Sequence, residues 1–323
     1  MKVVRAKDEL RSALKPLRGG RIGLVPTMGA FHDGHLALFR AAREECDTVV
    51  CSLFVNPAQF GQGDDLESYP RDEKRDLELA RAEGADFLFA PSPEEMYPAD
   101  FETWVEPERL ARELEGVIRP SHFRGMATIC LKLFNIVRPN AAYFGAKDAQ
   151  QLAVIERLVR DLDLELEIRP VETARDSDGL ALSSRNAYLS PAERRIALAL
   201  PRALALGAEA ARDGGDPVAV ARAALDEERG LKTQYVAVAD YVGPRLLAAV
   251  QVGRTRLIDN VSLNSSQNED PSTGGDRWMR GKDAGSVRIS DTGATEDAAS
   301  RRRARPGGGV LRSETSSKKG AAR

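Results

Sequence analysis

Through the first 171 residues, short apolar runs alternate with segments of helical periodicity. The runs that predict strands are 21–25, 48–55, 85–90, 141–145 and 164–171, and the segments that predict helices are 34–45, 66–84, 124–137 and 148–162. The run TVVCSLFV has almost no polar break, which is typical of a strand buried on both faces. The alternation predicts an α/β fold with a parallel sheet covered by helices on both faces. Such sheets bind ligands at the carboxyl ends of their strands, where the strand order reverses.

The chain changes character after this series of strands and helices. The segment 190–215 opens with Ser-Pro, a cap followed by proline, and predicts a pair of helices. Two further runs, 233–241 and 253–260, predict strands. Together they predict a small C-terminal α+β domain over 175–260, behind a first domain of 1–174.

The composition changes again at Val261. Residues 261–323 hold nine glycines, few large apolar residues, and 12 Lys and Arg against 8 Asp and Glu. Such a segment cannot bury enough apolar surface to offset the entropy of ordering, so we expect a disordered tail. Its run RRRAR is either a nucleic-acid-binding or partner-binding element or a solvated extension without a role, and we favour the second.

Composition argues against several classes of protein. The net charge of −2 gives no overall attraction to nucleic acid or to anionic membranes, and no apolar run approaches the roughly 18 residues of a membrane span. The N-terminus lacks the apolar core of a signal peptide. Cys46, Cys51 and Cys130 cannot all pair and show no CxxC spacing, which argues against a zinc finger or a disulfide scaffold. We therefore expect a cytoplasmic protein without nucleic-acid or membrane partners.

Two of the three histidines, His32 and His35, lie three residues apart just after an expected strand. Gly34 between them lets the backbone approach a ligand, and His35 falls in the first turn of the next helix, where free N–H groups attract anions. The pair predicts a triphosphate site in which imidazolium donors stabilise the charge that builds on the transferring phosphate. The alternatives are ordinary surface histidines or a metal site, but no cluster of Cys, His, Asp or Glu completes the latter.

The segment SDGLALSSRN places Ser183, Ser184 and Arg185 on a turn preceded by glycine. Two hydroxyls and a guanidinium can hold the β- and γ-phosphates and the departing pyrophosphate. The same residues also occur at a plain turn or helix start, so this segment alone is not specific.

The segment YFGAKDAQQL contains an expected strand and the start of a helix. Lys147 offers a point charge for phosphate, Asp148 suits a ribose hydroxyl or Mg²⁺, and Gln151 can read a hydroxy acid. The alternative is a surface helix whose first turn is capped by Asp148.

Two more segments place polar groups at strand ends or helix starts. FVNPAQFGQGDD contributes Asn56 and Gln59, neutral amides typical of a small-molecule pocket, although Asn-Pro is also a turn signal. RPSHFRGMAT places His122 and Arg124 just before a helix, where they either face a ligand or belong to a capped helix start.

In order and spacing, these segments resemble the pantoate–β-alanine ligase family of the HxGH nucleotidylyltransferase superfamily. The matching motifs, between residues 3 and 260, are PTMGAFHDGH, FVNPAQFG, YPR, RPSHFRG, YFGAKDAQQL, DGLALSSRN and TRLIDN. The resemblance implies a Rossmann-like first domain with a C-terminal lid domain. It also implies a ligase that adenylates pantoate with ATP and transfers the pantoyl group to β-alanine, releasing AMP and pyrophosphate. Mg²⁺ would accompany ATP, and the protein would be a homodimer.

The resemblance also assigns roles to residues. Catalysis would rest on His32, His35, Lys147 and Arg185, with His35 as proton donor. Gln59 would contact pantoate and β-alanine, and Gln151 would contact pantoate. ATP would be bound by three segments and one junction residue, namely Pro26, Thr27, Met28, Gly29, Ala30, Phe31, His32, Asp33, Gly34, His35, Gly145, Ala146, Lys147, Asp148, Ala174, Leu182, Ser183, Ser184 and Arg185.

Three positions depart from the family pattern. Phe31 stands where leucine is usual, Glu172 where proline is usual and Ala174 where valine is usual. The last two lie at the domain junction, where they bear on hinge stiffness and on packing against adenine. One rival reading is another HxGH-type nucleotidylyltransferase, which would lack YFGAKDAQQ and FVNPAQFG. Another is a nucleotide- or RNA-binding module that uses the basic tail, against which the neutral core argues.

Overall fold

The computed structural model describes residues 1–61, 64, 66–241, 243–264 and 288–289. Its first sheet has six strands in the order β1-β4-β3-β2-β5-β6, and every neighbouring pair is parallel. The strands are β1 (Lys2–Val4), β2 (Ile22–Thr27), β3 (Thr48–Leu53), β4 (Phe87–Phe89), β5 (Ala141–Gly145) and β6 (Glu167–Val171). From β2 the chain extends the sheet on one side through β3 and β4 and then crosses to the other side with β5. The strand order therefore reverses at the β2/β5 pair.

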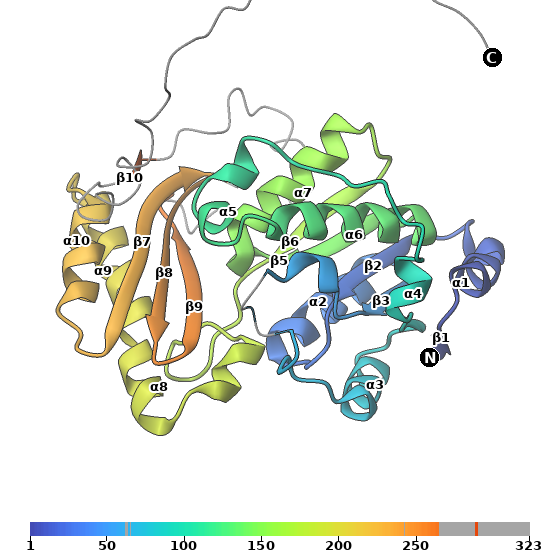
Figure 1. Cartoon of the computed structure of the whole chain (residues 1–323), viewed down its shortest axis with the longest axis horizontal. Coiled ribbons are helices and arrows are strands. Elements are labelled where there is room, and N and C mark those ends of the chain that lie inside the picture. Colours follow the sequence, from blue (N-terminus) through green and yellow to red (C-terminus); the bar gives the residue numbers. More distant parts are fainter. Residues whose placement is uncertain (62–63, 65, 242, 265–287, 290–323) are drawn as a thin grey trace, which may run out of the picture. The chain divides into compact units, whose positions relative to one another are not determined.

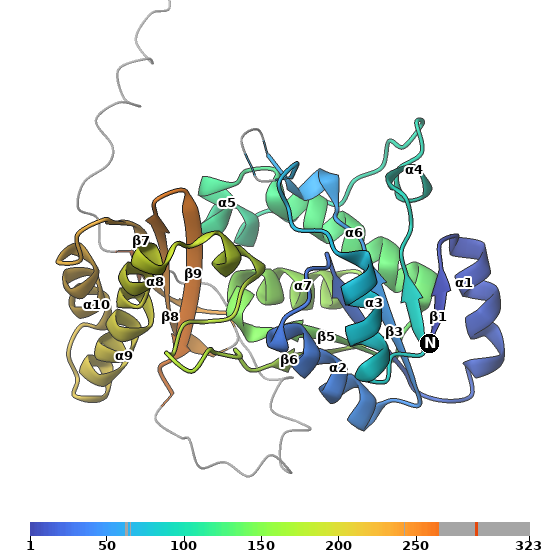
Figure 2. The ribbon, with the colours of Figure 1, turned by 90° about the horizontal axis from the view of Figure 1, so that it is seen from below.

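Helices cover both faces of this sheet (Figures 1 and 2). One face is covered by α1 (Lys7–Leu14), α6 (His122–Val137) and α7 (Ala149–Asp161), and the other by α2 (Asp33–Glu45) and α3 (Glu73–Ala82). Successive side chains of β2 alternate between the two cores, because residues of a strand point to opposite faces. Leu24 belongs to the first core, and Val25 packs in the second core with Phe39 of α2.

The second sheet is antiparallel, with the order β10-β7-β8-β9. Its strands are β7 (Leu231–Asp240), β8 (Pro244–Val252), β9 (Thr255–Ser262) and β10 (Arg288–Ile289). One face packs against α8 (Pro191–Ala197), α9 (Ala199–Arg212) and α10 (Pro217–Asp226). The other face, including Tyr235 and Leu247, joins the core that contains α6 and α7, so the two sheets share hydrophobic packing.

Short elements lie in the connections. They are α4 (Pro93–Met96), α5 (Glu115–Ile118) and the 3-10 turns η1 (Lys15–Leu17), η2 (Pro57–Gln59), η3 (Leu110–Arg112), η4 (Ala146–Asp148) and η5 (Ser184–Tyr188). Two of them follow parallel strands: η2 comes after β3, and η4 comes directly after β5. Within the described residues, no helix combines the length and the apolar character that a membrane crossing requires.

The predicted fold class is confirmed, and the differences are local. The helix expected at 66–84 begins only at Glu73, because Asp72 caps its first turn and Pro70 cannot continue a hydrogen-bonded helix. The strand expected at 253–260 continues to Ser262. The elements that were not predicted are β1, α1, α4, α5, α10, β8 and β10.

The domain limits stay predictions. Residues 1–290 form one compact unit, in which the division expected at 174/175 is not separated. Most of the tail expected from residue 261 lies outside the described residues.

Candidate functional site

A pocket opens at the carboxyl ends of β2, β3 and β5, where the strand order reverses. Its wall includes residues from both sheets and from the segments that join them. Most of the residues selected from the sequence line it, namely Pro26, Thr27, Met28, His32, Gly34, His35, Asn56, Gln59, His122, Gly145, Lys147, Asp148, Gln151, Ala174, Leu182, Ser183, Ser184 and Arg185. The structure does not place Gly29, Ala30, Phe31, Asp33, Ala146 or Arg124 in this wall.

His32 and His35 together cap the N-terminus of α2, at the helix start where the sequence placed them. Nδ1 of His32 accepts a hydrogen bond from the Gly34 amide at 3.1 Å, and Nδ1 of His35 accepts one from the His32 amide at 3.4 Å. The two ring centroids lie 4.2 Å apart. Because each Nδ1 accepts, each neutral ring carries its hydrogen on Nε2, which is left to donate to a ligand.

The two rings are neutral in the free protein, whereas the sequence suggested imidazolium donors. Burial, aided by the charge of Lys147, lowers the pKa of His32 to about 4. Burial, aided by His32 and Lys147, lowers the pKa of His35 to about 3. At neutral pH both groups are therefore N–H donors without a charge. A bound triphosphate would raise both pKa values, because negative charge favours the imidazolium form.

Gly34 lines the pocket, where the sequence predicted that a ligand approaches the backbone, and the structure shows that it also serves the helix cap. A Cβ added at Gly34 would lie 2.9 Å from Cε1 and 3.0 Å from Nδ1 of His32. Both distances are shorter than an ordinary carbon contact, so a side chain at this position would displace the imidazole. Glycine thus makes room for the ring that caps the helix.

The loop before His32 is held by Asp76 of α3, which sequence reasoning missed. The amides of Ala30 and Phe31 donate to the two carboxylate oxygens of Asp76 at 2.9 and 2.8 Å. Asp76 is only 1% exposed, and burial raises its pKa although the two amides counter the shift. Gly29 adopts a φ of 92°, which brings this loop against the carboxylate. No signal in the sequence could identify Asp76, because its partners lie 45 and 46 residues away.

Lys147 and Asp148 lie in η4, directly after β5. Asn260 of β9 holds this turn, because its Nδ2 donates to the carbonyl oxygens of Ala146 at 3.0 Å and of Lys147 at 2.8 Å. Asp148 occupies the cap position of α7, but its side chain makes no capping hydrogen bond. The carboxylate is therefore not used as the plain helix cap that was the alternative reading.

The segment with Ser183 and Ser184 is tied to the loop before α3. Oγ of Ser183 accepts a hydrogen bond from the Arg185 amide at 3.3 Å, and Oγ of Ser184 lies 3.4 Å from the hydroxyl of Tyr69. The hydroxyl of Tyr188 donates to the carbonyl oxygen of Ser68 at 2.8 Å. These contacts hold the segment along one wall of the pocket.

Gln59 is positioned by Asn56, which is 1% exposed. Nδ2 of Asn56 donates to Oε1 of Gln59 and to the carbonyl oxygen of Gly125, both at 3.1 Å. Oδ1 of Asn56 accepts from the hydroxyl of Tyr97 at 2.9 Å. The polar atoms of Asn56 are thus engaged within the protein, so the residue supports Gln59. Among the described residues, Nε2 of Gln59 donates to the weak acceptor Sδ of Met28, at 3.0 Å.

His122 and Arg124 both lie in α6, but only His122 lines the pocket. A carbonyl oxygen only accepts, so Nδ1 of His122 donates to the backbone oxygen of Gln59 at 3.1 Å. Burial, together with the charge of Arg119, lowers the pKa of His122 to about 4 and keeps the ring neutral. Arg124 lies 4.3 Å from the ring centroid of Trp104 and lines a separate groove.

The wall also contains residues that sequence reasoning did not select. They are Tyr69, Glu115, Arg119, Thr173, Tyr235, Arg256 and Asp259, among others. The buried hydroxyl of Thr173 has no hydrogen-bond partner within the described residues, so a ligand could supply one. Arg119 falls in the motif RPSHFRG and Arg256 in the motif TRLIDN, so both could have been selected from these motifs, whereas Glu115 resembles many other charged residues of the chain.

A resident metal ion does not fit the described residues, since they contain no group of three or more His, Cys, Asp or Glu side chains that could hold one. A divalent cation at Asp148 would need further oxygen ligands, because Mg²⁺ favours octahedral coordination by oxygen. The phosphate oxygens of a nucleotide are groups that could complete such a site.

Comparison with known proteins gives consistent matches. The chain matches the family model of pantoate–β-alanine ligase over residues 2–262. The pantothenate synthetase of Moorella thermoacetica is 53% identical over 260 residues, which are 76% of this chain and 92% of that protein. The crystal structure of pantothenate synthetase from Thermus thermophilus has a TM-score of 0.79 and 45% identity, covering 81% of this chain and 99% of that chain. The pantoate–β-alanine ligase of Francisella tularensis, complexed with β-γ ATP and β-alanine, has a TM-score of 0.72 and 35% identity, covering 81% and 98%.

Proposed function

Because the chain belongs to the pantoate–β-alanine ligase family, we propose that its reaction takes place in the pocket at the carboxyl ends of β2, β3 and β5. The protein is a ligase that uses ATP to condense pantoate with β-alanine through a pantoyl adenylate, releasing AMP and pyrophosphate. One observation carries the proposal for the site: the histidine pair that caps α2 lines the same pocket as Lys147, Gln59 and Gln151.

The nucleotide occupies the part of the pocket around the start of α2. The Nε2–H groups of His32 and His35 and the ammonium of Lys147 donate to the phosphates, where charge builds as pyrophosphate departs. Ser183, Ser184 and Arg185 hold the outer phosphates from the opposite segment of the wall. Asp148 meets the ribose or a cation, and Ala174 packs against adenine.

Pantoate and β-alanine occupy the part of the pocket around Gln59 and Gln151. Nε2 of Gln59, whose acceptor among the described residues is the weak thioether of Met28, donates to the carboxylate of the substrate. A carboxylate oxygen of pantoate attacks the α-phosphorus, the bond from that phosphorus to the bridging oxygen breaks, and pyrophosphate leaves. Holding both reactants in one pocket makes this displacement effectively unimolecular.

The second step forms the amide. The neutral amine of β-alanine attacks the acyl carbon of the adenylate, the bond from that carbon to the phosphate oxygen breaks, and AMP leaves with the bonding pair. The amine then loses its proton. No side chain forms a covalent bond, because adenylation already supplies a good leaving group. The crystallised ligase of Francisella tularensis holds β-alanine together with a nucleotide, which supports a shared pocket for both steps.

The proposal also covers the cation, the roles of the two domains, the oligomeric state and the location of the protein. Mg²⁺ enters with ATP, with Asp148 as its protein contact. Residues 1–174 bind the nucleotide and pantoate, residues 175–260 act as the lid domain, and the protein works in the cytoplasm as a homodimer. Loss of activity after chelation and recovery with Mg²⁺ checks the cation, and sedimentation of the purified protein checks the dimer.

Exchange of labelled pyrophosphate into ATP tests the site. We expect exchange that requires pantoate and does not require β-alanine. Lys147→Ala should lower the exchange rate on the order of 10²-fold, the scale for loss of one group that stabilises the transition state. Lys74→Ala is the matched control, because Lys74 is an exposed lysine of α3 outside the pocket wall. Equal exchange rates in the two variants would contradict the assignment of the nucleotide to this pocket.

A further inference from the structure

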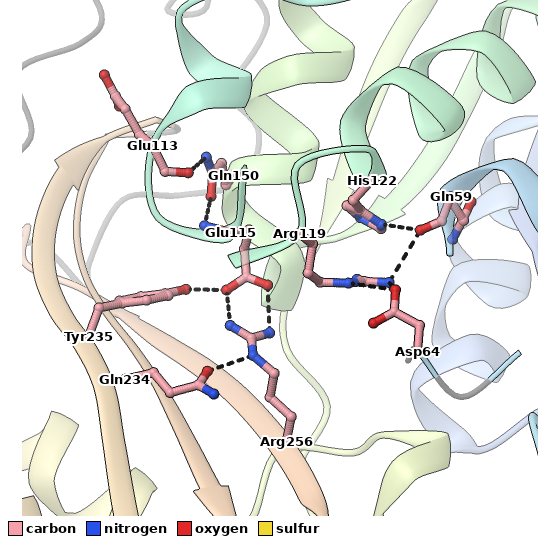
Figure 3. Close-up of polar contacts among 10 residues, drawn as sticks. All are labelled: Gln59, Asp64, Glu113, Glu115, Arg119, His122, Gln150, Gln234, Tyr235 and Arg256. Carbon is pink, nitrogen blue, oxygen red and sulfur yellow. Dashed lines mark hydrogen bonds and ion pairs between the residues drawn. The ribbon is translucent and has the colours of Figure 1, made fainter. Parts of the chain in front are cut away.

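Glu115 of α5 connects the first part of the chain to the antiparallel sheet (Figure 3). Its carboxylate accepts two hydrogen bonds from the guanidinium of Arg256 in β9, at 2.6 and 2.7 Å, and one from the hydroxyl of Tyr235 in β7, at 2.7 Å. Nε of Arg256 donates in turn to Gln234 at 2.7 Å. Glu115 is 8% exposed, and although burial alone would raise its pKa, Arg256 and Tyr235 hold the pKa below the usual value. We name these three residues, Glu115, Arg256 and Tyr235, the Glu115 clamp.

The segment that carries Glu115 is also held to α7. The Glu115 amide donates to Oε1 of Gln150 at 3.0 Å. Nε2 of Gln150 donates to the carbonyl oxygens of Leu110 at 2.7 Å and Glu113 at 2.9 Å. Gln150 is 3% exposed, so these bonds are shielded from water. The single turn of α5 is therefore fixed between α7 on one side and the antiparallel sheet on the other.

Arg119 lies at the end of this turn, and its amide donates to the Glu115 carbonyl oxygen at 2.8 Å. Its Nη2 donates to the backbone oxygen of Gln59 at 3.3 Å and to Asp64 at 3.1 Å. The same Gln59 oxygen accepts from His122, so two donors fix the backbone of the residue assigned to the acid substrates (Figure 3). Although burial would raise the pKa of Asp64, the Gly61 amide and Arg119 keep it low. The guanidinium of Arg119 is thus engaged with the protein.

From this chain of contacts we propose that Arg119 is a positioning residue for Gln59, and that the Glu115 clamp couples it to the antiparallel sheet. The inference rests on the proposed role of Gln59 in binding pantoate. When Glu115 is bound to Arg256 and Tyr235, α5 fixes the position of Arg119. Arg119 and His122 then fix the backbone carbonyl of Gln59. The side-chain amide of Gln59 therefore meets the carboxylate of pantoate in a fixed orientation. The affinity for pantoate therefore depends on the position of the antiparallel sheet relative to α5, although no residue of the Glu115 clamp need touch pantoate.

Steady-state kinetics of single variants give the first test. Arg119→Gln removes the charge-assisted hydrogen bonds, and we expect the KM for pantoate to rise roughly 10-fold, which is the scale for losing one such bond. The KM for ATP should stay within about 2-fold, because Arg119 is engaged with Gln59 and Asp64. Arg119→Lys keeps the charge and should recover part of the loss. Glu115→Gln should change the KM for pantoate in the same direction as Arg119→Gln.

Double variants separate positioning from a general structural effect. If Arg119 acts through Gln59, adding Arg119→Gln to Gln59→Ala changes the KM for pantoate by less than about 2-fold, and adding Glu115→Gln does the same. Val117→Ala is the matched control, because Val117 lies in the same turn with 68% of its surface exposed. Thermal unfolding of every variant reports whether it is folded.

The outcomes are distinct. If the increases in the KM for pantoate from Arg119→Gln and Gln59→Ala multiply in the double variant, the positioning role is overturned, while Gln59 remains a pantoate contact. A normal KM for pantoate in both Arg119→Gln and Arg119→Lys would overturn it as well. A normal KM in Gln59→Ala would contradict the proposed role of Gln59 itself, and the positioning role would fall with it. An effect of Val117→Ala as large as that of Glu115→Gln would overturn the coupling through the clamp.

Discussion

Gly125 lies in the first turns of α6, where this helix meets η2, and we predict that Gly125→Ala damages pantoate binding. A Cβ at Gly125 would lie 2.1 Å from the carbonyl oxygen of Ala58 and 2.5 Å from the amide nitrogen of Gln59. Ordinary contacts of a Cβ begin at 3.4 Å, so the Ala58 carbonyl must retreat by about 1.3 Å. Both atoms are backbone, so no side chain can rotate away. The displacement moves η2 and with it Gln59.

A shift of about 1 Å in a positioned group can cost on the order of 10²-fold in rate. We therefore expect kcat/KM for pantoate to fall by about that factor in Gly125→Ala, with the KM for ATP nearly unchanged. The change in the free energy of unfolding of Gly125→Ala gives an independent test of the same contact. Helix propensity alone would stabilise the variant by up to about 1 kcal/mol. Overpacking costs about 1–3 kcal/mol, so the melting temperature should fall by a few degrees.

The assay is steady-state formation of AMP at varied pantoate, combined with thermal unfolding of the same samples. Gly19→Ala is the control, because a Cβ at Gly19 would meet no atom within 4 Å. A Gly125→Ala protein with a raised melting temperature and a normal kcat/KM for pantoate would contradict this prediction. It would show that η2 does not need its close contact with α6.

Three further predictions concern the histidines. His35→Ala should lower pantoate-dependent pyrophosphate exchange on the order of 10²-fold, and an unchanged rate would contradict its role as donor. Gly34→Ala should also lower this exchange, because the new Cβ would lie 2.9 Å from the ring of His32, and a wild-type rate would refute the need for glycine there. The third prediction follows from the pKa values of His32, His35 and His122, about 4, 3 and 4 against 6.5 in the unfolded chain. The unfolded chain binds more protons, so the free energy of unfolding falls as pH drops from about 6.5 towards 4, by at most about 1.4 kcal/mol per pH unit for each histidine. Urea unfolding across this range measures the slope, and a flat profile would contradict it.

Much of the fold follows from local patterns in the sequence. The strand β3 is a continuous apolar run, and α8 begins at the cap Ser190 followed by proline, so the type of such elements could be predicted. Short elements could not. The strand β1 has three residues and is stabilised by its pairing with β4, more than 80 positions away. Its short segment has no local pattern that distinguishes it from a loop.

Some residues of the pocket could likewise be predicted from the sequence, and others could not. His32, Lys147 and Ser183 belong to motifs at the ends of predicted elements, so their place in the wall could be anticipated. The contacts that hold these residues in place could not be predicted, because each contact joins residues that lie far apart in the sequence. Asp76 holds the loop of Ala30 from α3, and Asn260 holds the Lys147 turn from β9, 113 positions away. Charged and polar residues of this kind are frequent, and only the folded chain shows which of them meet.

Transfer of an oxygen label from pantoate to AMP shows directly whether this protein activates the carboxylate of pantoate as an adenylate. Pantoate labelled with ¹⁸O in both carboxylate oxygens is turned over with ATP and β-alanine, and the products are analysed by mass spectrometry. We expect one ¹⁸O in AMP and one in the amide carbonyl of pantothenate, because the attacking oxygen stays with phosphorus when the bond from that oxygen to the acyl carbon breaks. Unlabelled AMP, with the label in another phosphate product or fully retained in pantothenate, would contradict it.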